Sequence, residues 1–449
     1  MRNPKHWSKE VYILSAIVFS ICCQAQAEDF SLDYEFPPQP TATLGGSIYG
    51  DSVSSVQPAH LKQAPRLGAR HLLYYTATIS KQRFTFIFAE SKGKGKGYDT
   101  LIADANGDGV MVNEKRYYVK PNHEISNFYA VHLTLEVDGE KAPYALTVSL
   151  DQGAIDDKDT GEKGWFCAAS HIGYWKGKFK VEKQAVQLVV SDYNGNGRYD
   201  DPNTTTNGRD AKGDIFILDR DSKGNFSWYW DLSPMRQSNV VALGGKFYKM
   251  RVHPTGRKVS FTPFSPPLGT LQTDYPNSRI RLINEVADIV LDSKNGIIQV
   301  PVGSYSGTTW QVESTGQDGI PWQLQGTMKK SIMIKENETV VLQLLSSPVA
   351  TVIVDKMARL PPELITIIKT ANGDKVFRIL RDGEDYAPSI KILDATGKTV
   401  SRFQYPDKNN QWASDRLWNR PQGLKGKITA VPDLEALPFK IELKPSVEF

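Results

Sequence analysis

Residues 129–135 read Tyr-Ala-Val-His-Leu-Thr-Leu, with apolar side chains alternating with polar or small ones. Successive side chains of a β-strand point to opposite faces of a sheet, so this period of two predicts a strand with one buried face. Residues 83–88, Arg-Phe-Thr-Phe-Ile-Phe, and residues 186–190, Val-Gln-Leu-Val-Val, are of the same kind. All three are rich in β-branched or aromatic residues and short, which is typical of strands. The chain is therefore predicted to be mainly β.

Breaks in this pattern predict several domains. Residues 28–262 form an N-terminal β domain, in which two similar loops suggest two related halves, about 28–150 and 151–262. Residues 263–267, Pro-Phe-Ser-Pro-Pro, read as a linker, because prolines withhold backbone donors and end sheet pairing. Residues 268–347 form the next module, and residues 348–449 form an Ig-like β-sandwich with about seven short strand-like runs. Residues 279–292 fit either a helix or a pair of strands.

The N-terminus predicts export. Arg2, Lys5 and Lys9 precede an apolar run over residues 11–23, and residues 25–27, Ala-Gln-Ala, provide a small-residue cleavage site. These are the three parts of a secretory signal peptide over residues 1–27, and the apolar run is shorter than a membrane-spanning helix needs. A membrane anchor and a lipidated Cys22 are the alternatives, although Ile21 is larger than the residue that usually precedes a lipoprotein cysteine. We expect a secreted or periplasmic protein without a transmembrane segment after cleavage.

Composition narrows the classes of partner and chemistry. Cleavage would leave Cys167 as the one cysteine, so no intramolecular disulfide would form, and the net charge would fall from +4 to +2. A nearly neutral chain without a basic stripe gives no reason to expect nucleic-acid binding. Cys167, Ser170 and His171 are close in sequence, but no third group that would orient a catalytic pair is evident. No catalytic residue is predicted.

An oxygen-rich loop begins at Asp104, directly after an apolar strand-like run. Oxygen-bearing side chains occupy its first, third and fifth positions, and Gly109 occupies its sixth. Ca2+ prefers about six to eight oxygen ligands, and a glycine at this position permits the sharp turn around the ion. The predicted ligands are Asp104, Asn106, Asp108, the backbone carbonyl of Val110, and Glu114.

A second loop repeats the pattern from Asp192, with Gly197 at its sixth position. Its predicted ligands are Asp192, Asn194, Asn196, the backbone carbonyl of Arg198, and the closing carboxylates Asp200 and Asp201. Asp214, Asp219 and Asp221 come a little later, with Asp214 and Asp219 at the two ends of a strand-like run, and these acids could fold back on the same ion. For both loops the alternative is an ordinary turn, because Asn and Asp tolerate left-handed conformations and bond their own backbone.

The first six positions of both loops resemble EF-hand and dockerin-type calcium loops. Those families close the loop with a bidentate Glu at the twelfth position, where this chain has Lys115 and Asn203. The flanking segments also read as strands. The two loops are therefore expected to be hairpin-borne structural sites for one or two Ca2+ ions.

The second module carries another resemblance. Residues 300–305, Val-Pro-Val-Gly-Ser-Tyr, and the later run Thr-Val-Val-Leu at 339–342 resemble transthyretin-like and carboxypeptidase-regulatory-like β-sandwich modules. The resemblance implies a rigid spacer or binding platform and no activity. Together with the loops, it makes the chain similar to large secreted bacterial β-proteins, from which no activity transfers.

The sequence thus predicts a multidomain β-protein whose calcium-loop hairpins stabilise a non-catalytic scaffold. Its expected partner is a carbohydrate, a cell-envelope component or a protein. Four tryptophans could stack on sugars, with core packing as the alternative: Trp228, Trp230, Trp310 and Trp322. The rival interpretation is a secreted hydrolase that acts on a polymer and whose cleft is supported by calcium.

Overall fold

The computed structural model is built from strands throughout the residues that it describes. These are residues 27–37, 46–48, 50, 52–68, 71–93, 96–120, 125–156, 163–202, 213–219, 235–236, 239–355, 363–386, 388–403 and 429–443. The prediction of a mainly β fold is confirmed, and no helix occurs in these ranges. Residues 1–26 of the expected signal peptide, which include Cys22, lie outside them, as do Asp221, Trp228 and Trp230. No helix that could cross a membrane is found in the described part of the chain.

The first unit comprises residues 46–171 and contains two sheets. One has the strand order β4-β5-β6-β7 and the other β3-β10-β9-β8. In the second sheet, Val131, Leu133 and Leu135 are buried while the residues between them are exposed, as the alternation in sequence predicted. The strands are β3 (Ser47–Ile48), β4 (Leu72–Ile79), β5 (Gln82–Ala89), β6 (Thr100–Ala103), β7 (Arg116–Tyr118), β8 (Ile125–Val137), β9 (Glu140–Asp156) and β10 (Lys163–His171).

The second unit combines the N-terminal strands with residues 174–264. Its sheets have the orders β1-β17-β16-β15 and β14-β13-β12-β11-β2. The chain passes from the first unit to the second at Ile172 and Gly173, whereas the sequence suggested a division near residue 150, which lies inside β9. The strands are β1 (Glu28–Ser31), β2 (Asp33–Glu35), β11 (Tyr174–Val181), β12 (Gln184–Ser191), β13 (Ile215–Asp219), β14 (Met235–Arg236), β15 (Val240–Leu243), β16 (Lys246–Val252) and β17 (Lys258–Phe264).

The third unit covers residues 268–443 and centres on a large sheet with the path β20-β19-β22-β23-β28-β27-β26-β33, to which β24 and β29 add. Strand β23 pairs with β28, so one sheet runs across the boundary expected at residue 347. The strands are β18 (Leu268–Thr273), β19 (Ser278–Ile283), β20 (Asp288–Asp292), β21 (Ile297–Pro301), β22 (Gly303–Thr315), β23 (Pro321–Thr327), β24 (Ile332–Ile334), β25 (Thr339–Leu342), β26 (Val349–Asp355), β27 (Glu363–Lys369), β28 (Lys375–Arg381), β29 (Glu384–Asp385), β30 (Ile390–Leu393), β31 (Thr399–Phe403), β32 (Thr429–Pro432) and β33 (Glu442–Leu443).

Local details of the third unit settle two open points. The ambiguous segment 279–292 lies in the antiparallel pair β19 and β20, not in a helix. Trp310 and Trp322 are fully buried in the core of this unit, so core packing is their role and neither offers a face to a sugar. Tyr305, the last residue of the Val-Pro-Val-Gly-Ser-Tyr motif, is also buried and donates a hydrogen bond to the carbonyl of Pro301 at 2.8 Å.

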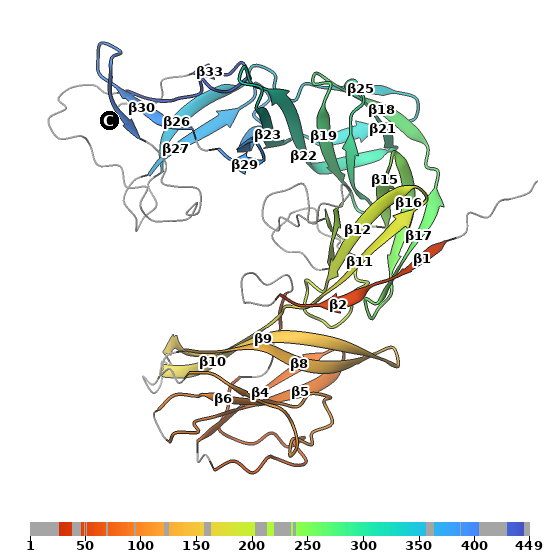
Figure 1. The fold of residues 1–449 in the computed structure, drawn as a ribbon, viewed down its shortest axis with the longest axis vertical. Coiled ribbons are helices and arrows are strands. Elements are labelled where there is room, and N and C mark those ends of the chain that lie inside the picture. The colour runs from red at the N-terminus through yellow and green to blue at the C-terminus, as the bar shows by residue number, and fades with distance from the viewer. Residues whose placement is uncertain are drawn as a thin grey trace, which may run out of the picture.

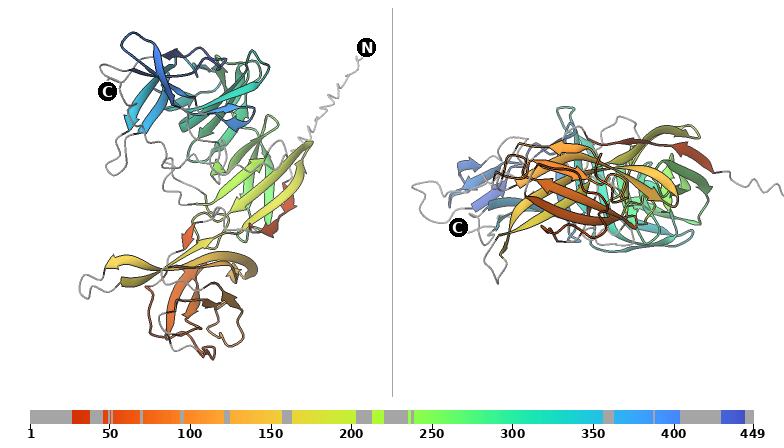
Figure 2. Two further views of the ribbon diagram at one scale, coloured as in Figure 1. Left: turned by 60° about the vertical axis from the view of Figure 1, so that its left-hand side comes forward. Right: turned by 90° about the horizontal axis from the view of Figure 1, so that it is seen from below.

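The three units follow one another in a bent row (Figure 1), and the further views show the first unit set at one end of it (Figure 2). Buried side chains of the first and second units nevertheless belong to one continuous hydrophobic cluster, which includes Leu133 of β8 and Trp175 of β11. The two units are therefore packed against each other. The second oxygen-rich loop lies at this junction.

Candidate metal centres

In the first loop, the side chain of the first residue, Asp104, is hydrogen-bonded to backbone amides further along the loop. Asp104 follows β6 and is fully buried, and its two carboxylate oxygens accept hydrogen bonds from the amides of Gly107 and Gly109, both at 2.9 Å. Both glycines have positive φ, 71° and 77°. A side chain on Gly109 would also approach the carbonyl oxygen of His60 to 2.6 Å. Glycine is therefore required at the sixth position by conformation and by space.

The alternate residues of the first loop each cap the backbone two residues further on. The Asn106 side-chain oxygen accepts from the amide of Asp108 at 3.1 Å, and Asp108 accepts from the amide of Val110 at 2.7 Å. The side-chain amide of Asn106 also donates to Asp108 at 2.9 Å. The hydrogen bond from Val110 lowers the pKa of Asp108, which therefore stays ionised at neutral pH.

Glu114, the acid predicted to close the first loop, lies close enough to its acids to feel their charge. Burial, and after it the charges of Asp104 and Asp108, raises the pKa of Glu114, so the three carboxylates share one neighbourhood. Lys115, at the twelfth position, instead lies over the ring of Tyr117, with its ammonium nitrogen 4.7 Å from the ring centre. Glu114 is thus the acid nearest the position that Glu occupies in an EF-hand.

A parallel bridge between Gln63 and Val110 joins the first loop to the segment before it, and the carbonyl of Val110 takes no part in its hydrogen bonds. The amide of Gln63 donates to the Gly109 carbonyl at 3.1 Å. The amide of Met111 donates to the Gln63 carbonyl at 2.8 Å. These two bonds do not use the carbonyl of Val110. The bridge fixes the loop and leaves that oxygen out of the pairing.

The second loop has the same internal hydrogen bonds. Asp192 follows β12, is fully buried, and accepts from the amides of Gly195 and Gly197, both at 2.7 Å. Asn194 accepts from the amide of Asn196 at 3.0 Å. The Asn196 side chain in turn accepts from the amide of Arg198 at 2.8 Å. The two loops therefore share one conformation although their surroundings differ.

The two carboxylates predicted to close the second loop are placed differently. Asp201 accepts hydrogen bonds from the side-chain amides of Asn194, at 3.2 Å, and Asn196. Asp200 forms a bidentate ion pair with Arg198, with distances of 2.9 Å and 3.0 Å. Of the two, Asp201 lies with the alternate residues of the loop. Asp200 is instead paired with the side chain of Arg198. The sequence had predicted a role for the backbone carbonyl of Arg198 only.

Asp214 joins the second loop from the start of β13. One of its oxygens, Oδ2, accepts from the amide of Asp201 at 2.9 Å, and its own amide donates to the Asp201 carbonyl at 2.9 Å. Its other oxygen, Oδ1, is buried without a hydrogen-bond partner among the described residues. Burial, followed by the charge of Asp192, raises the pKa of Asp214 far above its usual range. Burial also raises the pKa of Asp192.

A buried polar network that sequence reasoning missed surrounds Asp192. The hydroxyl of Tyr144 donates to Asp192 at 2.7 Å, and the ring of His171 stacks on Tyr144 with centroids 4.1 Å apart. His171 Nδ1 lies 3.3 Å from the Asp192 carbonyl, and its Nε2 lies 3.1 Å from the Tyr199 hydroxyl. Burial lowers the pKa of His171 to about 3, so its ring is neutral and places no cation beside Asp192. Only the three-dimensional pairing of β9, β10 and the loop brings these residues together.

In neither loop could a metal ion be held by His, Cys, Asp and Glu side chains alone. Within the described ranges, no three or more such side chains gather closely enough to hold a metal ion. The loops would supply a mixture of carboxylate, amide and carbonyl oxygens, which is the donor set of Ca2+. Cys167 is buried, and burial raises the pKa of its thiol far above the usual range, which disfavours the reactive thiolate.

Comparison of the chain with protein-family models, curated proteins and solved structures finds no match. Its function is therefore inferred from the two loops and their surroundings.

Proposed function

We propose that the two loops bind calcium, one ion each, and that these ions stabilise an exported, non-catalytic β-scaffold. The observation that supports this is the buried carboxylate of Asp214, which lies against Asp201 of the second loop and has one oxygen, Oδ1, without a hydrogen-bond partner among the described residues. The hydrogen bonds within the loops fit an ordinary turn as well as a calcium loop. In EF-hand loops, residues at the first, third and fifth positions ligate Ca2+. Oxygen-bearing side chains stand at the same three positions in both loops of this chain, which supports the proposal.

The oxygen inventory favours a hard divalent cation. The first loop combines nearby carboxylates with amide side chains, and so does the second when Asp214 is counted with Asp192 and Asp201, although among the described residues no three acids gather closely enough to hold an ion by themselves. Amide oxygens and the carbonyls of Val110 and Arg198 complete each set. Mg2+ demands a stricter octahedral geometry and keeps several waters, whereas Ca2+ accepts such irregular oxygen shells.

The proposed location is outside the cytoplasm, as the N-terminal sequence suggests. Extracellular modules bind Ca2+ with dissociation constants of about 10^-4 to 10^-3 M, so modest sites would be filled there. The third unit would act as a β-sandwich spacer, transthyretin-like and Ig-like in kind, and would present a surface to a carbohydrate, an envelope component or a protein. The alternative of a calcium-supported hydrolase acting on a polymer rests on the sequence alone.

Calorimetric titration of EDTA-treated, desalted protein with CaCl2 tests this proposal. We expect two bound ions per chain and little heat with MgCl2. Because an ion that binds only the folded state stabilises it by RT ln(1 + [L]/Kd), each site should add about 2.7 kcal/mol at a hundredfold excess over Kd. Thermal melting with EDTA and with CaCl2 measures that gain. Unchanged melting together with no bound calcium would show that the loops are plain turns.

A further inference from the structure

The second loop belongs by sequence to the second unit but is bonded to the first. The Asn196 carbonyl accepts from the amide of Ser80, in the β4–β5 turn, at 2.7 Å. The Asp192 carbonyl accepts from the amide of Gly46, just before β3, at 3.3 Å. Arg198 reaches Asp138, in the β8–β9 turn, with both carboxylate oxygens at 3.0 Å. Three separate segments of the first unit are thus attached to one loop of the second.

Close packing accompanies these bonds. A side chain added to Gly197 would meet Ile79 at 2.8 Å and Leu135 at 2.9 Å, both in the first unit. A side chain on Gly195 would approach the carbonyl of Ser47 to 2.9 Å. The loop backbone is therefore pressed against the first unit, and any loosening of the loop would open this contact.

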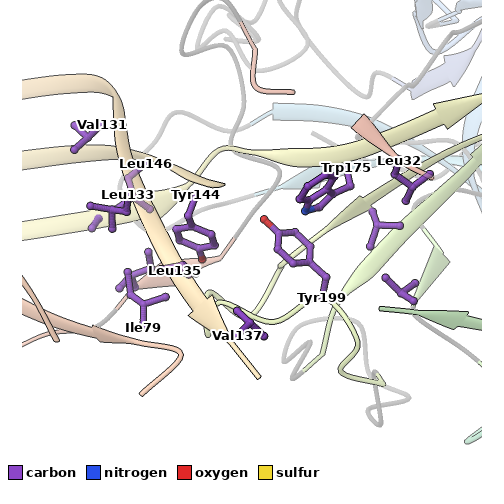
Figure 3. Packing of buried hydrophobic residues seen from close by; sticks show 14 of the residues in the cluster. Leu32, Ile79, Val131, Leu133, Leu135, Val137, Tyr144, Leu146, Trp175 and Tyr199 are labelled. Carbon is purple, nitrogen blue, oxygen red and sulfur yellow. The ribbon is translucent and has the colours of Figure 1, made fainter. Parts of the chain in front are cut away.

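The same loop is fixed to the second unit on its other side. The amide of Tyr199 donates to the Pro254 carbonyl, in the β16–β17 turn, at 3.0 Å. Figure 3 shows Tyr144 among leucines of the first unit and Tyr199 beside Trp175 and Leu32 of the second. The Tyr144 hydroxyl donates a hydrogen bond to Asp192, and the Tyr199 hydroxyl is hydrogen-bonded to His171. The carboxylate of Asp192 therefore lies where side chains from both units meet.

The unpartnered oxygen of Asp214 points to a ligand at this place. Asp214 is fully buried, its carboxylate lies against Asp201, and within the described residues no ion pair includes Asp192 or Asp214. Burying an ionised carboxylate without a counter-charge is strongly unfavourable, and a bound cation removes that cost. Asp214 is outside the Asp-x-Asn-x-Asn-Gly motif, so it would add a ligand from another strand.

We infer that calcium in the second loop clamps the first unit to the second, with Asp214 as one of its ligands. This inference rests on the proposed function. An ion held between Asp214 and the mixed oxygens of the second loop would fix the end of β12 and the start of β13 together. It would thereby hold the carbonyls that receive the amides of Ser80 and Gly46. A half-open cleft of about 650 Å3 beside Asn196 and Arg198 gives solvent a route to the loop.

The first loop provides an internal control, because its hydrogen bonds to other described segments stay within the first unit. The Gly109 carbonyl accepts from the amide of Lys62 at 2.8 Å, and the Ala105 carbonyl accepts from the amide of Thr134 at 2.7 Å. Calcium there would stabilise one unit only. The two loops should therefore differ in their effect on the junction even if their affinities are equal.

Hydrogen exchange resolved to single amides tests the clamp on the full chain, with EDTA and with saturating CaCl2. We expect calcium to slow exchange of the Ser80 and Gly46 amides by about tenfold or more, because both bonds cross the junction. Asp214→Asn, which keeps the shape of the side chain, should abolish this slowing. Asp108→Asn, in the first loop, should leave it intact.

The outcomes separate the clamp from calcium binding itself. If titration shows two bound ions but the Ser80 and Gly46 amides exchange at the same rate with and without calcium, the clamp is wrong and the proposed function stands. The clamp is equally wrong if Asp108→Asn removes the slowing as completely as Asp214→Asn. If no calcium binds, both proposals fail. The wild-type comparison remains decisive even if Asp214→Asn does not fold.

Discussion

The two oxygen-rich loops have the same internal hydrogen bonds but opposite surroundings. The first loop begins with the fully buried Asp104, and among the described residues its hydrogen bonds join it to its own unit. The second loop also begins with a fully buried acid, but its backbone is hydrogen-bonded to both units, and the fully buried Asp214 joins it. The difference shows that the motif determines the local turn, whereas the consequence of binding an ion depends on what the turn is packed against. The same site chemistry would stabilise one unit in the first loop and a junction in the second.

The largest expected effect is a difference in stability between variants of Asp192 and Asp104, the first residues of the two loops. Asp192→Ala should destabilise the calcium-loaded protein by about 3–5 kcal/mol, because it removes a buried ligand and leaves the amides of Gly195 and Gly197 and the Tyr144 hydroxyl unpaired. Asp104→Ala should cost less, about 2–3 kcal/mol, since it frees two amides and no buried hydroxyl. Urea unfolding in saturating CaCl2 measures both. Equal losses would remove the distinction between the loops.

The next effect distinguishes two adjacent carboxylates of the second loop. Asp201→Asn should weaken calcium binding there by about ten- to a hundredfold, because Asp201 lies with Asn194 and Asn196. Asp200→Asn is the matched control and should leave affinity nearly unchanged, since its partner is Arg198. Calorimetric titration in an Asp104→Asn background isolates the second loop. A larger effect of Asp200→Asn would assign closure of the loop to the other acid.

A smaller effect concerns pH and belongs to the buried loop. Burial raises the pKa of Asp192 from 3.8 to about 6, so between these values the ion-free folded protein holds a proton that the unfolded chain has released. The contribution of Asp192 to the stability of the ion-free form therefore rises as pH falls from about 6 to about 4, by up to about 1.4 kcal/mol per pH unit. The calcium-bound form needs the ionised carboxylate and does not gain. The difference in melting temperature between CaCl2 and EDTA should thus shrink below pH 6.

His171 does not disturb that comparison. Burial lowers its pKa from 6.5 to about 3, so the unfolded chain binds an extra proton below pH 6.5 and stability falls in that range. This loss affects both forms alike and cancels from their difference. In Asp192→Asn, a pH-dependent difference that persisted at full size would assign the effect to other carboxylates.

Local features of the fold could be predicted from sequence, and non-local ones could not. Val131, Leu133 and Leu135 were identified as a buried face because side-chain direction alternates along any strand. The oxygen-rich loops were identifiable because their hydrogen bonds join residues two to five positions apart. The approach of Tyr144 and His171 to Asp192 depends on the pairing of distant strands. So does the pairing of β23 with β28 across the expected domain boundary.

The smallest effect tests closure of the exposed loop, where solvent can replace a lost ligand. Glu114→Gln should weaken calcium binding by about three- to tenfold, because it removes one of three charges from the shell while the amide oxygen still reaches the ion. Lys115→Gln is the control, since the Lys115 ammonium group lies over Tyr117. Titration in an Asp192→Asn background reports the first loop alone. If Lys115→Gln strengthened binding as much as Glu114→Gln weakened it, the net charge near the loop would explain both results, and Glu114 would lose its role as a ligand.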